Sequence, residues 1–147
     1  MRILMLIIAL LVSLKALAQT NVSNIKVEDL NRDELAMSAI IDDDRHTLIS
    51  VGGTWCKPCL LQKPFVASLG QQYPQYLKVV FLFWRDTPEK IKLKFGATSE
   101  LENYFLATYS IIEQLNINTY PTHILVDAKG NVISNDVSIN DVGDLIK

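Results

Sequence analysis

The sequence predicts one α/β domain, a three-layer α/β/α sandwich in which helices cover both faces of a mixed central sheet. Segments with helical spacing alternate with short apolar segments, and the last two apolar segments are joined as a hairpin. Strands separated by helices are typical of a parallel sheet, and a closing hairpin adds antiparallel strands. The length of 147 residues suits one domain with a single hydrophobic core.

The first half of the chain contains an expected edge strand at Ile25–Val27. Asn31 followed by Glu34 is a variant of the capping box, and it predicts a helix that frays at residues 42–45. The β-rich segment Thr47–Val51 predicts the first central strand.

The middle of the chain predicts a helix followed by a buried strand. Apolar residues recur at helical spacing after Cys56 until Tyr73–Pro74, which ends the helix. These residues are Leu60, Leu61, Phe65 and Leu69. The segment Lys78–Phe83 is apolar without alternation, as expected of a strand that is covered on both faces.

Two helices are expected next. Thr87–Pro88 predicts the start of a short helix, and Gly96 predicts its end. Ser99 with Glu102 forms a full capping box, and apolar residues at helical spacing follow it. We expect that second helix to end near Asn116, a residue type that tolerates the left-handed conformation.

The C-terminal part predicts a hairpin and a terminal helix. The strands are Thr122–Asp127 and Asn131–Ser134, with Gly130 in the turn between them. Residues Ile139–Lys147 predict a weak helix. The complete domain is expected to occupy residues 19–147.

Residues 1–18 are predicted to be a signal peptide that is removed. Met1–Arg2 is a positively charged start, Ile3–Leu14 is an apolar stretch, and Ala16–Ala18 is a cleavage motif. A helix of that apolar length covers about 18 Å, short of a hydrocarbon core of about 30 Å. We therefore expect export to the bacterial periplasm, and a retained membrane anchor is the less favoured alternative.

Composition argues against a nucleic-acid partner. The net charge is -2 and the sequence has no run of basic residues. Hydrophobic residues make up 49% of the chain, as in a folded protein rather than a disordered one.

The two cysteines of the chain, Cys56 and Cys59, lie in the segment GGTWCKPC. A zinc site would have to recruit His46 and His123, whose spacing fits no zinc-finger pattern, so we expect no metal. An inert disulfide is a second alternative, but a two-residue loop constrains little of the unfolded chain. Export permits a persistent disulfide, and the C-x-x-C spacing favours a redox pair.

The predicted position of Cys56, between a strand and the start of a helix, gives the two cysteines different roles. A thiol there faces unpaired backbone N–H groups and the positive end of the helix dipole, which favour the nucleophilic thiolate. Cys59 is almost one turn further on and can attack the mixed disulfide that Cys56 forms. Cys56 is thus the expected nucleophile and Cys59 the expected resolving residue.

The segment Trp55–Cys59 resembles the W-C-x-P-C signature of the thioredoxin superfamily, with Pro58 as its proline. Pro64 matches the helix-kinking proline of that family. The segment Thr119–Thr122 resembles its cis-proline loop, with Pro121 as the cis residue. The export signal and the extra helical segment most resemble exported oxidoreductases of the TlpA/ResA type.

The resemblance implies a thioredoxin-like domain that reduces disulfides of periplasmic substrate proteins and uses no cofactor beyond the Cys56–Cys59 disulfide. A membrane thiol-disulfide protein would supply the electrons, and we expect a monomer. Thr119 and Tyr120 would bind the substrate peptide beside the cysteines. Trp55 is expected to pack beside the disulfide.

Lys57 and two departures from the family leave alternatives open. Lys57 can stabilise a neighbouring thiolate, but a surface charge is too weak to decide the direction of electron flow. Ser50 and Gln62 occupy the positions where thioredoxins and ResA-type enzymes respectively carry a carboxylate that assists proton transfer. A disulfide oxidase or isomerase, or a non-catalytic peptide-binding module, therefore remains an alternative.

Overall fold

The computed structural model describes residues 19–96 and 98–147, and the predicted signal peptide lies outside the described residues. The strands are β1 (Lys26–Glu28), β2 (Glu34–Ala36), β3 (His46–Gly52), β4 (Leu77–Phe83), β5 (Tyr104–Leu106), β6 (Thr122–Val126) and β7 (Val132–Ser134). The α-helices are α2 (Lys57–Gln72), α3 (Pro88–Phe95), α4 (Tyr109–Gln114) and α5 (Val142–Leu145). The 3-10 helices of the described residues are η1 (Met37–Ala39), η2 (Ser99–Asn103) and η3 (Ile139–Asp141).

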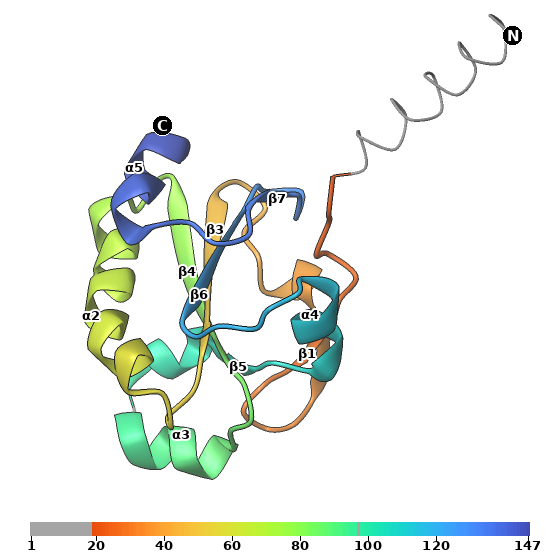
Figure 1. The fold of residues 1–147 in the computed structure, drawn as a ribbon, viewed down its shortest axis with the longest axis vertical. Helices are drawn as coiled ribbons and strands as arrows, with labels where there is room; N and C mark the ends of the chain where they lie inside the picture. The colour runs from red at the N-terminus through yellow and green to blue at the C-terminus, as the bar shows by residue number, and fades with distance from the viewer. Residues whose placement is uncertain (1–18, 97) are drawn as a thin grey trace, which may run out of the picture.

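The strands form a mixed sheet with the order β2-β1-β5-β4-β3-β6-β7. The central strands β3, β4 and β5 are parallel, whereas β6 and β7 add antiparallel pairs on one side and β1 and β2 on the other. Helices α2 and α5 lie on one side of this sheet and α4 lies on the other (Figure 1). The predicted three-layer sandwich with a mixed sheet is confirmed.

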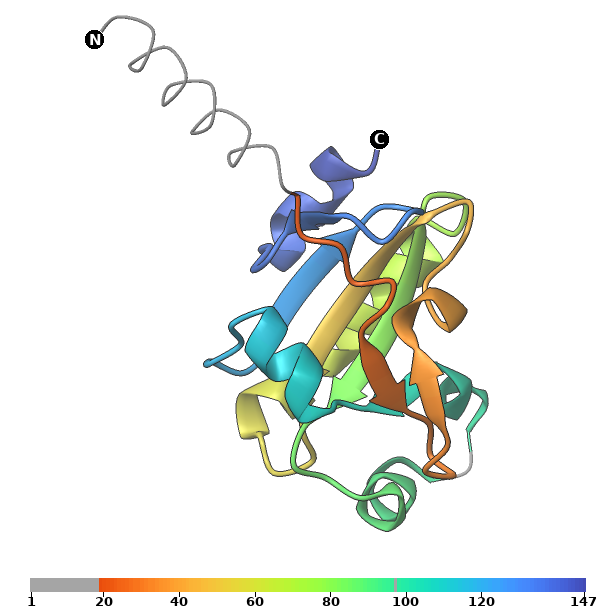
Figure 2. The ribbon, with the colours of Figure 1, turned by 90° about the vertical axis from the view of Figure 1, so that its right-hand side faces the viewer.

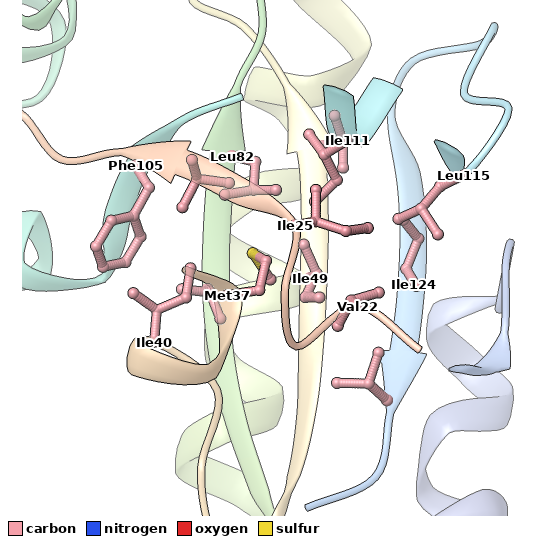
Figure 3. Packing of buried hydrophobic residues seen from close by; sticks show 14 of the residues in the cluster. Val22, Ile25, Met37, Ile40, Ile49, Leu82, Phe105, Ile111, Leu115 and Ile124 are labelled. Atoms are coloured by element: carbon pink, nitrogen blue, oxygen red, sulfur yellow. The ribbon is translucent and has the colours of Figure 1, made fainter. Parts of the chain in front are cut away.

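Two hydrophobic clusters hold the layers together, one on each face of the sheet. One cluster joins the sheet to η1, α4 and the segment before β1, and Figure 3 shows Met37, Ile49 and Ile111 pointing into it. The other cluster packs α2, α3 and α5 against the opposite face through residues such as Leu69, Ile91 and Val142. Alternate residues of the central strands contribute to the two faces, which explains their continuous apolar sequences.

The predicted helix after Asn31 is wrong, because this segment forms the hairpin of β1 and β2 followed by η1. The Asp29 carboxylate organises the turn by accepting hydrogen bonds from the backbone N–H groups of Asn31 at 2.7 Å and Asp33 at 3.0 Å. Arg32 has a φ of 71°, which ends any helical path here. Figure 2 shows the orange hairpin at the edge of the sheet.

The predicted continuous helix after Ser99 is also wrong. Its first turn is η2, its middle is strand β5, and only α4 is α-helical. Strand β5 pairs with β4 from Phe81–Tyr104 to Phe83–Leu106, and all three of its residues are buried. Pairing with a central strand buries both faces of this segment, which the local helical spacing cannot offer.

The remaining predicted elements have the expected types. Helix α3 begins at Thr87, whose side chain accepts from the backbone N–H of Lys90, and it ends at Gly96 with a φ of 72°. Asn116, just after α4, has a φ of 51°. Among the described residues, no helix is both long and apolar enough to cross a membrane.

Candidate redox site at the start of helix α2

Cys56 and Cys59 form a disulfide at the start of α2, with a distance of 5.3 Å between their Cα atoms. Cys56 is the N-cap residue, and its sulfur accepts a hydrogen bond from the backbone N–H of Cys59 at 3.3 Å. Pro58 lies in the first turn, where a helix can accommodate a residue without an N–H group. A thiolate at Cys56 would therefore face a backbone donor and the positive end of a 16-residue helix.

Gly52 and Gly53 allow two side chains to approach the end of β3. A Cβ atom on Gly52 would lie 2.7 Å from Sγ of Cys59, and one on Gly53 would lie 2.2 Å from Nε1 of Trp55. Real Cβ atoms essentially never come so close, so a side chain at either glycine would force a neighbour to move. The disulfide and the Trp55 indole are thus held directly against this strand end.

Asp86 fixes the loop that leads into the cysteines. Its carboxylate accepts hydrogen bonds from the backbone N–H of Thr54 at 2.6 Å and from the Thr54 hydroxyl at 2.9 Å. It also accepts from the backbone N–H of Thr87 at 3.1 Å. One side chain after β4 therefore joins the loop before α2 to the start of α3.

Trp55 connects the cysteine segment to the predicted substrate loop. Its Nε1 donates to the backbone oxygen of Trp84 at 2.8 Å, and its ring contacts the Tyr120 ring edge-on at 5.5 Å between centroids. The peptide bond between Tyr120 and Pro121 is cis, as the resemblance implies. The indole is still 52% exposed, so an aromatic surface remains available beside the disulfide.

The inner side of the disulfide faces a small cavity between α2, α3 and the sheet. The cavity has a volume of about 20 Å³, enough for one water molecule. Its lining combines apolar residues with Ser50, Cys59 and Lys63 as the polar ones. Ser50 is buried, so the position of the thioredoxin carboxylate holds a neutral hydroxyl next to the resolving cysteine.

Lys63 has a largely buried side chain, which is 13% exposed. Its Nζ lies 4.8–4.9 Å from the ring centroids of Phe81, Phe95 and Tyr104. The same nitrogen is 3.0 Å from Oε2 of Glu100, which also accepts from the Tyr104 hydroxyl at 3.0 Å. These hydrogen bonds, that of Lys63 above all, lower the pKa of the Glu100 carboxyl, which favours its ionised form.

Gln62 contacts a buried histidine, since its Oε1 lies 3.1 Å from Nε2 of His123. An amide oxygen only accepts, so in this arrangement Nε2 donates and Nδ1 is a buried acceptor without a partner among the described residues. Burial lowers the pKa of the imidazole, and the nearby carboxylate of Asp136 raises it in part. His123 is thus a buried neutral base joined to α2.

The other predicted residues lie around this centre or away from it. Lys57 is exposed on the first turn of α2, and Thr119 is exposed before the cis peptide bond. Thr119 accepts a hydrogen bond from the Thr122 hydroxyl at its backbone oxygen, at 2.6 Å. His46 begins β3, at the end opposite to Gly52, and no group of three or more potential metal ligands occurs within residues 19–96 and 98–147.

Sequence reasoning missed Lys63, Glu100 and the role of Asp86. Lys63 carried a usable signal, since it lies four residues after Cys59 and four-residue spacing places side chains on the same helix face. Asp86 also carried a signal, since it follows a predicted central strand at the end where open α/β sheets place their sites. Glu100 carried none, because it is separated from Lys63 by 37 residues.

Comparisons in sequence connect the chain to thioredoxin-like proteins, although no family model matches it. It is 30% identical over 89 residues to thioredoxin-like protein YneN of Bacillus subtilis. This alignment covers 58% of this chain and 52% of that protein. It is 26% identical over 121 residues to thiol-disulfide oxidoreductase ResA of Bacillus cereus, which covers 75% of this chain and 64% of that protein. The chain therefore spans less than two thirds of both curated relatives.

Comparison of structures gives the same fold. The thioredoxin domain of a thiol-disulfide oxidoreductase from Bacteroides vulgatus matches with a TM-score of 0.70 at 17% identity. The match covers 89% of this chain and 99% of that domain. The fold of the described residues is the thioredoxin fold, and the predicted resemblance to the thioredoxin superfamily and its ResA-like members is confirmed.

Proposed function

We propose that this thioredoxin-fold chain is an exported thiol-disulfide oxidoreductase that reduces disulfides in other proteins. The observation that carries the proposal is the Cys56–Cys59 disulfide at the N-terminus of α2, with Cys56 as the N-cap. A thiolate in this position is stabilised by the Cys59 N–H and by the helix dipole, and the thiolate is the form that attacks disulfides.

The reaction uses the two cysteines in sequence. In the reduced protein the Cys56 thiolate attacks one sulfur of the substrate disulfide, which forms a mixed disulfide and releases the other substrate sulfur as a thiolate. Cys59 then loses its proton and attacks Sγ of Cys56, which closes the Cys56–Cys59 disulfide and releases the second substrate sulfur. Two electrons pass from the protein to the substrate, which takes up two protons.

The surface outside the disulfide suits a peptide substrate. Trp55 and Tyr120 form an aromatic edge contact next to the cis peptide bond, and Phe65 and Pro121 line an adjoining open groove of about 540 Å³. Phe65 is 66% exposed on α2, although its spacing suggested a core position. Apolar side chains left exposed around a redox centre can contact the residues that flank a substrate disulfide.

Export and the reducing direction belong to the same proposal. The predicted signal peptide and the similarity to a protein named ResA support an extracytoplasmic reductase that a membrane thiol-disulfide protein recharges. Neither Lys57 nor the fold determines the direction of electron flow, so the reduction potential has to be measured.

The full chain should accelerate the reduction of a protein disulfide, and Cys56→Ser should abolish the acceleration. Equilibration with glutathione buffers should give a potential near about -270 mV for a reductase, whereas a value near about -120 mV would indicate an oxidant. A disulfide that cannot be cycled by small thiols would contradict the proposal and favour a non-catalytic peptide-binding module.

A further inference from the structure

The resolving cysteine has no carboxylate on the sheet side, yet a lysine with a largely buried side chain lines the same cavity. Cys59 and Lys63 lie four residues apart on α2 and line the same cavity of about 20 Å³. Phe81 and Phe95, whose rings enclose the Lys63 ammonium, are walls of that cavity as well. The ammonium group therefore lies over two rings of the cavity that Cys59 also lines.

Among the described residues that line the cavity, only Lys63 is charged. Ser50 is neutral, and α3 contributes only Phe95 to the lining. His123, paired with Ser50 across strands β3 and β6, is a buried base whose pKa is lowered by its burial. The charged partner that remains is Glu100, whose side chain is 57% exposed and reaches Lys63 from η2.

We propose that Lys63 is a positioning residue that stabilises the Cys59 thiolate when it attacks the mixed disulfide. The inference rests on the proposed function, and it replaces assistance by a base with stabilisation by a fixed positive charge. The Cys59 proton leaves through water and neutralises the thiolate that the substrate releases, so the step needs no carboxylate at Ser50. A cation close to a thiolate favours the ionised form.

Glu100 opposes this effect, so variants of Lys63 and Glu100 should change the ionisation of Cys59 in opposite directions. Its carboxylate is 3.0 Å from the Lys63 ammonium and neutralises part of the positive charge that Cys59 experiences. Removing Lys63 should make ionisation of Cys59 harder, and removing the charge of Glu100 should make it easier. Damage to packing would shift both variants in the same direction.

The experiment follows the full chain, in its reduced form, as it reacts with a limiting amount of a chromogenic aromatic disulfide of nitrothiobenzoate. Attack by Cys56 releases the first nitrothiobenzoate in a bimolecular phase, and attack by Cys59 releases the second in an intramolecular phase. We expect Lys63→Met to raise the midpoint of the second phase's pH profile by about one pH unit. Below that midpoint the phase should slow about three- to fourfold, because the scarcer thiolate is also more nucleophilic.

Two further variants complete the comparison. Lys63→Arg keeps the charge and should restore most of the profile, and Glu100→Gln should move the midpoint to lower pH. Lys94→Met, which removes an exposed lysine next to Phe95 on α3, should leave the profile unchanged.

An unchanged second phase in Lys63→Met, or equal shifts in Lys63→Met and Glu100→Gln, would overturn the inference. If Lys63→Met does not fold, the direction of the Glu100→Gln shift decides it. Loss of the first phase in the unmodified chain would instead overturn the proposed function, so the two failures are distinguishable.

Discussion

The two sides of the Cys56–Cys59 disulfide differ in exposure and in the source of their charge. On the outer side, Lys57 is exposed and Trp55 is 52% exposed. On the inner side, Lys63 is 13% exposed and is held by three aromatic rings and one carboxylate. Burial weakens the screening by solvent, so a charge on the inner side acts more strongly than the same charge on the outer side.

The difference teaches that the two cysteines experience separate environments. Cys56 caps the helix terminus and is 5% exposed, whereas Cys59 is partly exposed and also lines the cavity with Ser50 and Lys63. Changes on the inner side should therefore alter stability and resolution, and changes on the outer side should alter recognition. The variants below test this division, from the largest expected effect to the smallest.

Gly52→Ala should have the largest effect. The new methyl group would lie 2.7 Å from Sγ and 2.9 Å from Cβ of Cys59, so the strand end or the disulfide must move. We expect the free energy of unfolding to fall by about 1–3 kcal/mol, as for other overpacked sites. Urea unfolding of the oxidised protein measures this loss.

Gly70→Ala is the matched control for that measurement. Gly70 lies in α2, and a methyl group there would be 3.3 Å from Cγ2 of Val79, which needs only a small adjustment. Alanine also favours a helix over glycine by up to about 1 kcal/mol. If both variants lose the same stability, the inner side of the disulfide is not specially constrained.

Tyr120→Ala tests the outer side. Losing the edge contact with Trp55 should cost about 1 kcal/mol of stability, because aromatic pairs contribute about 0.5–1.5 kcal/mol. The rate of reduction should fall more for a disulfide-bonded peptide than for a small aromatic disulfide. Tyr109→Ala removes a similar contact, with Trp84, and should not change that ratio. An equal change in both variants would contradict a substrate role for Tyr120.

His123 should make stability depend on pH. Its pKa in the folded protein is lowered below the ordinary value of 6.5, mainly by burial, so the unfolded chain binds this proton more readily. The contribution is complete above about pH 6.5 and is lost as the pH falls towards the lower folded pKa, by at most about 1.4 kcal/mol per pH unit. Urea unfolding between about pH 7.5 and 5.5 should show a smaller slope in His123→Gln. Equal slopes would refute this assignment.

The carboxyl group of Asp42 titrates in a different pH range from His123. The hydrogen bond with Arg45 lowers the pKa of Asp42 to about 2. Its stabilisation is lost only as the pH falls from about 3.8 to about 2, below the range where His123 acts. The slope measured near pH 6 therefore belongs to His123 rather than to this ion pair.

The sequence predicted the elements whose ends are marked by nearby residues. Helix α3 has both of its signals within the segment Thr87–Gly96, and α2 begins immediately after Cys56. Strand β5 could not be predicted in this way. Its apolar residues have helical spacing, but the segment pairs with β4 and β1, which are distant in sequence. Local patterns cannot weigh such pairings against helix formation.

The same limit applies to the site. The cysteine pair and Pro121 were visible as local motifs, and the sequence also raised the question of how Cys59 loses its proton. Glu100 was not visible, because only the fold brings η2 against α2. The burial of Lys63 was hidden as well, since a lysine is exposed far more often than it is enclosed by aromatic rings.

Lys57→Met should have the smallest effect and is the sharpest contrast with Lys63→Met. Lys57 is exposed beside Cys56, so solvent and salt screen its charge. A contribution of about 0.2–0.4 kcal/mol corresponds to about 4–9 mV in the reduction potential, since about 30 mV equals 1.4 kcal/mol. The shift should be measurable against glutathione buffers at low salt and should vanish at about 1 M salt, whereas the Lys63→Met effect should persist. A Lys57 effect that is large or insensitive to salt would show that the outer side also acts through a poorly solvated charge, and the division between the two sides would fail.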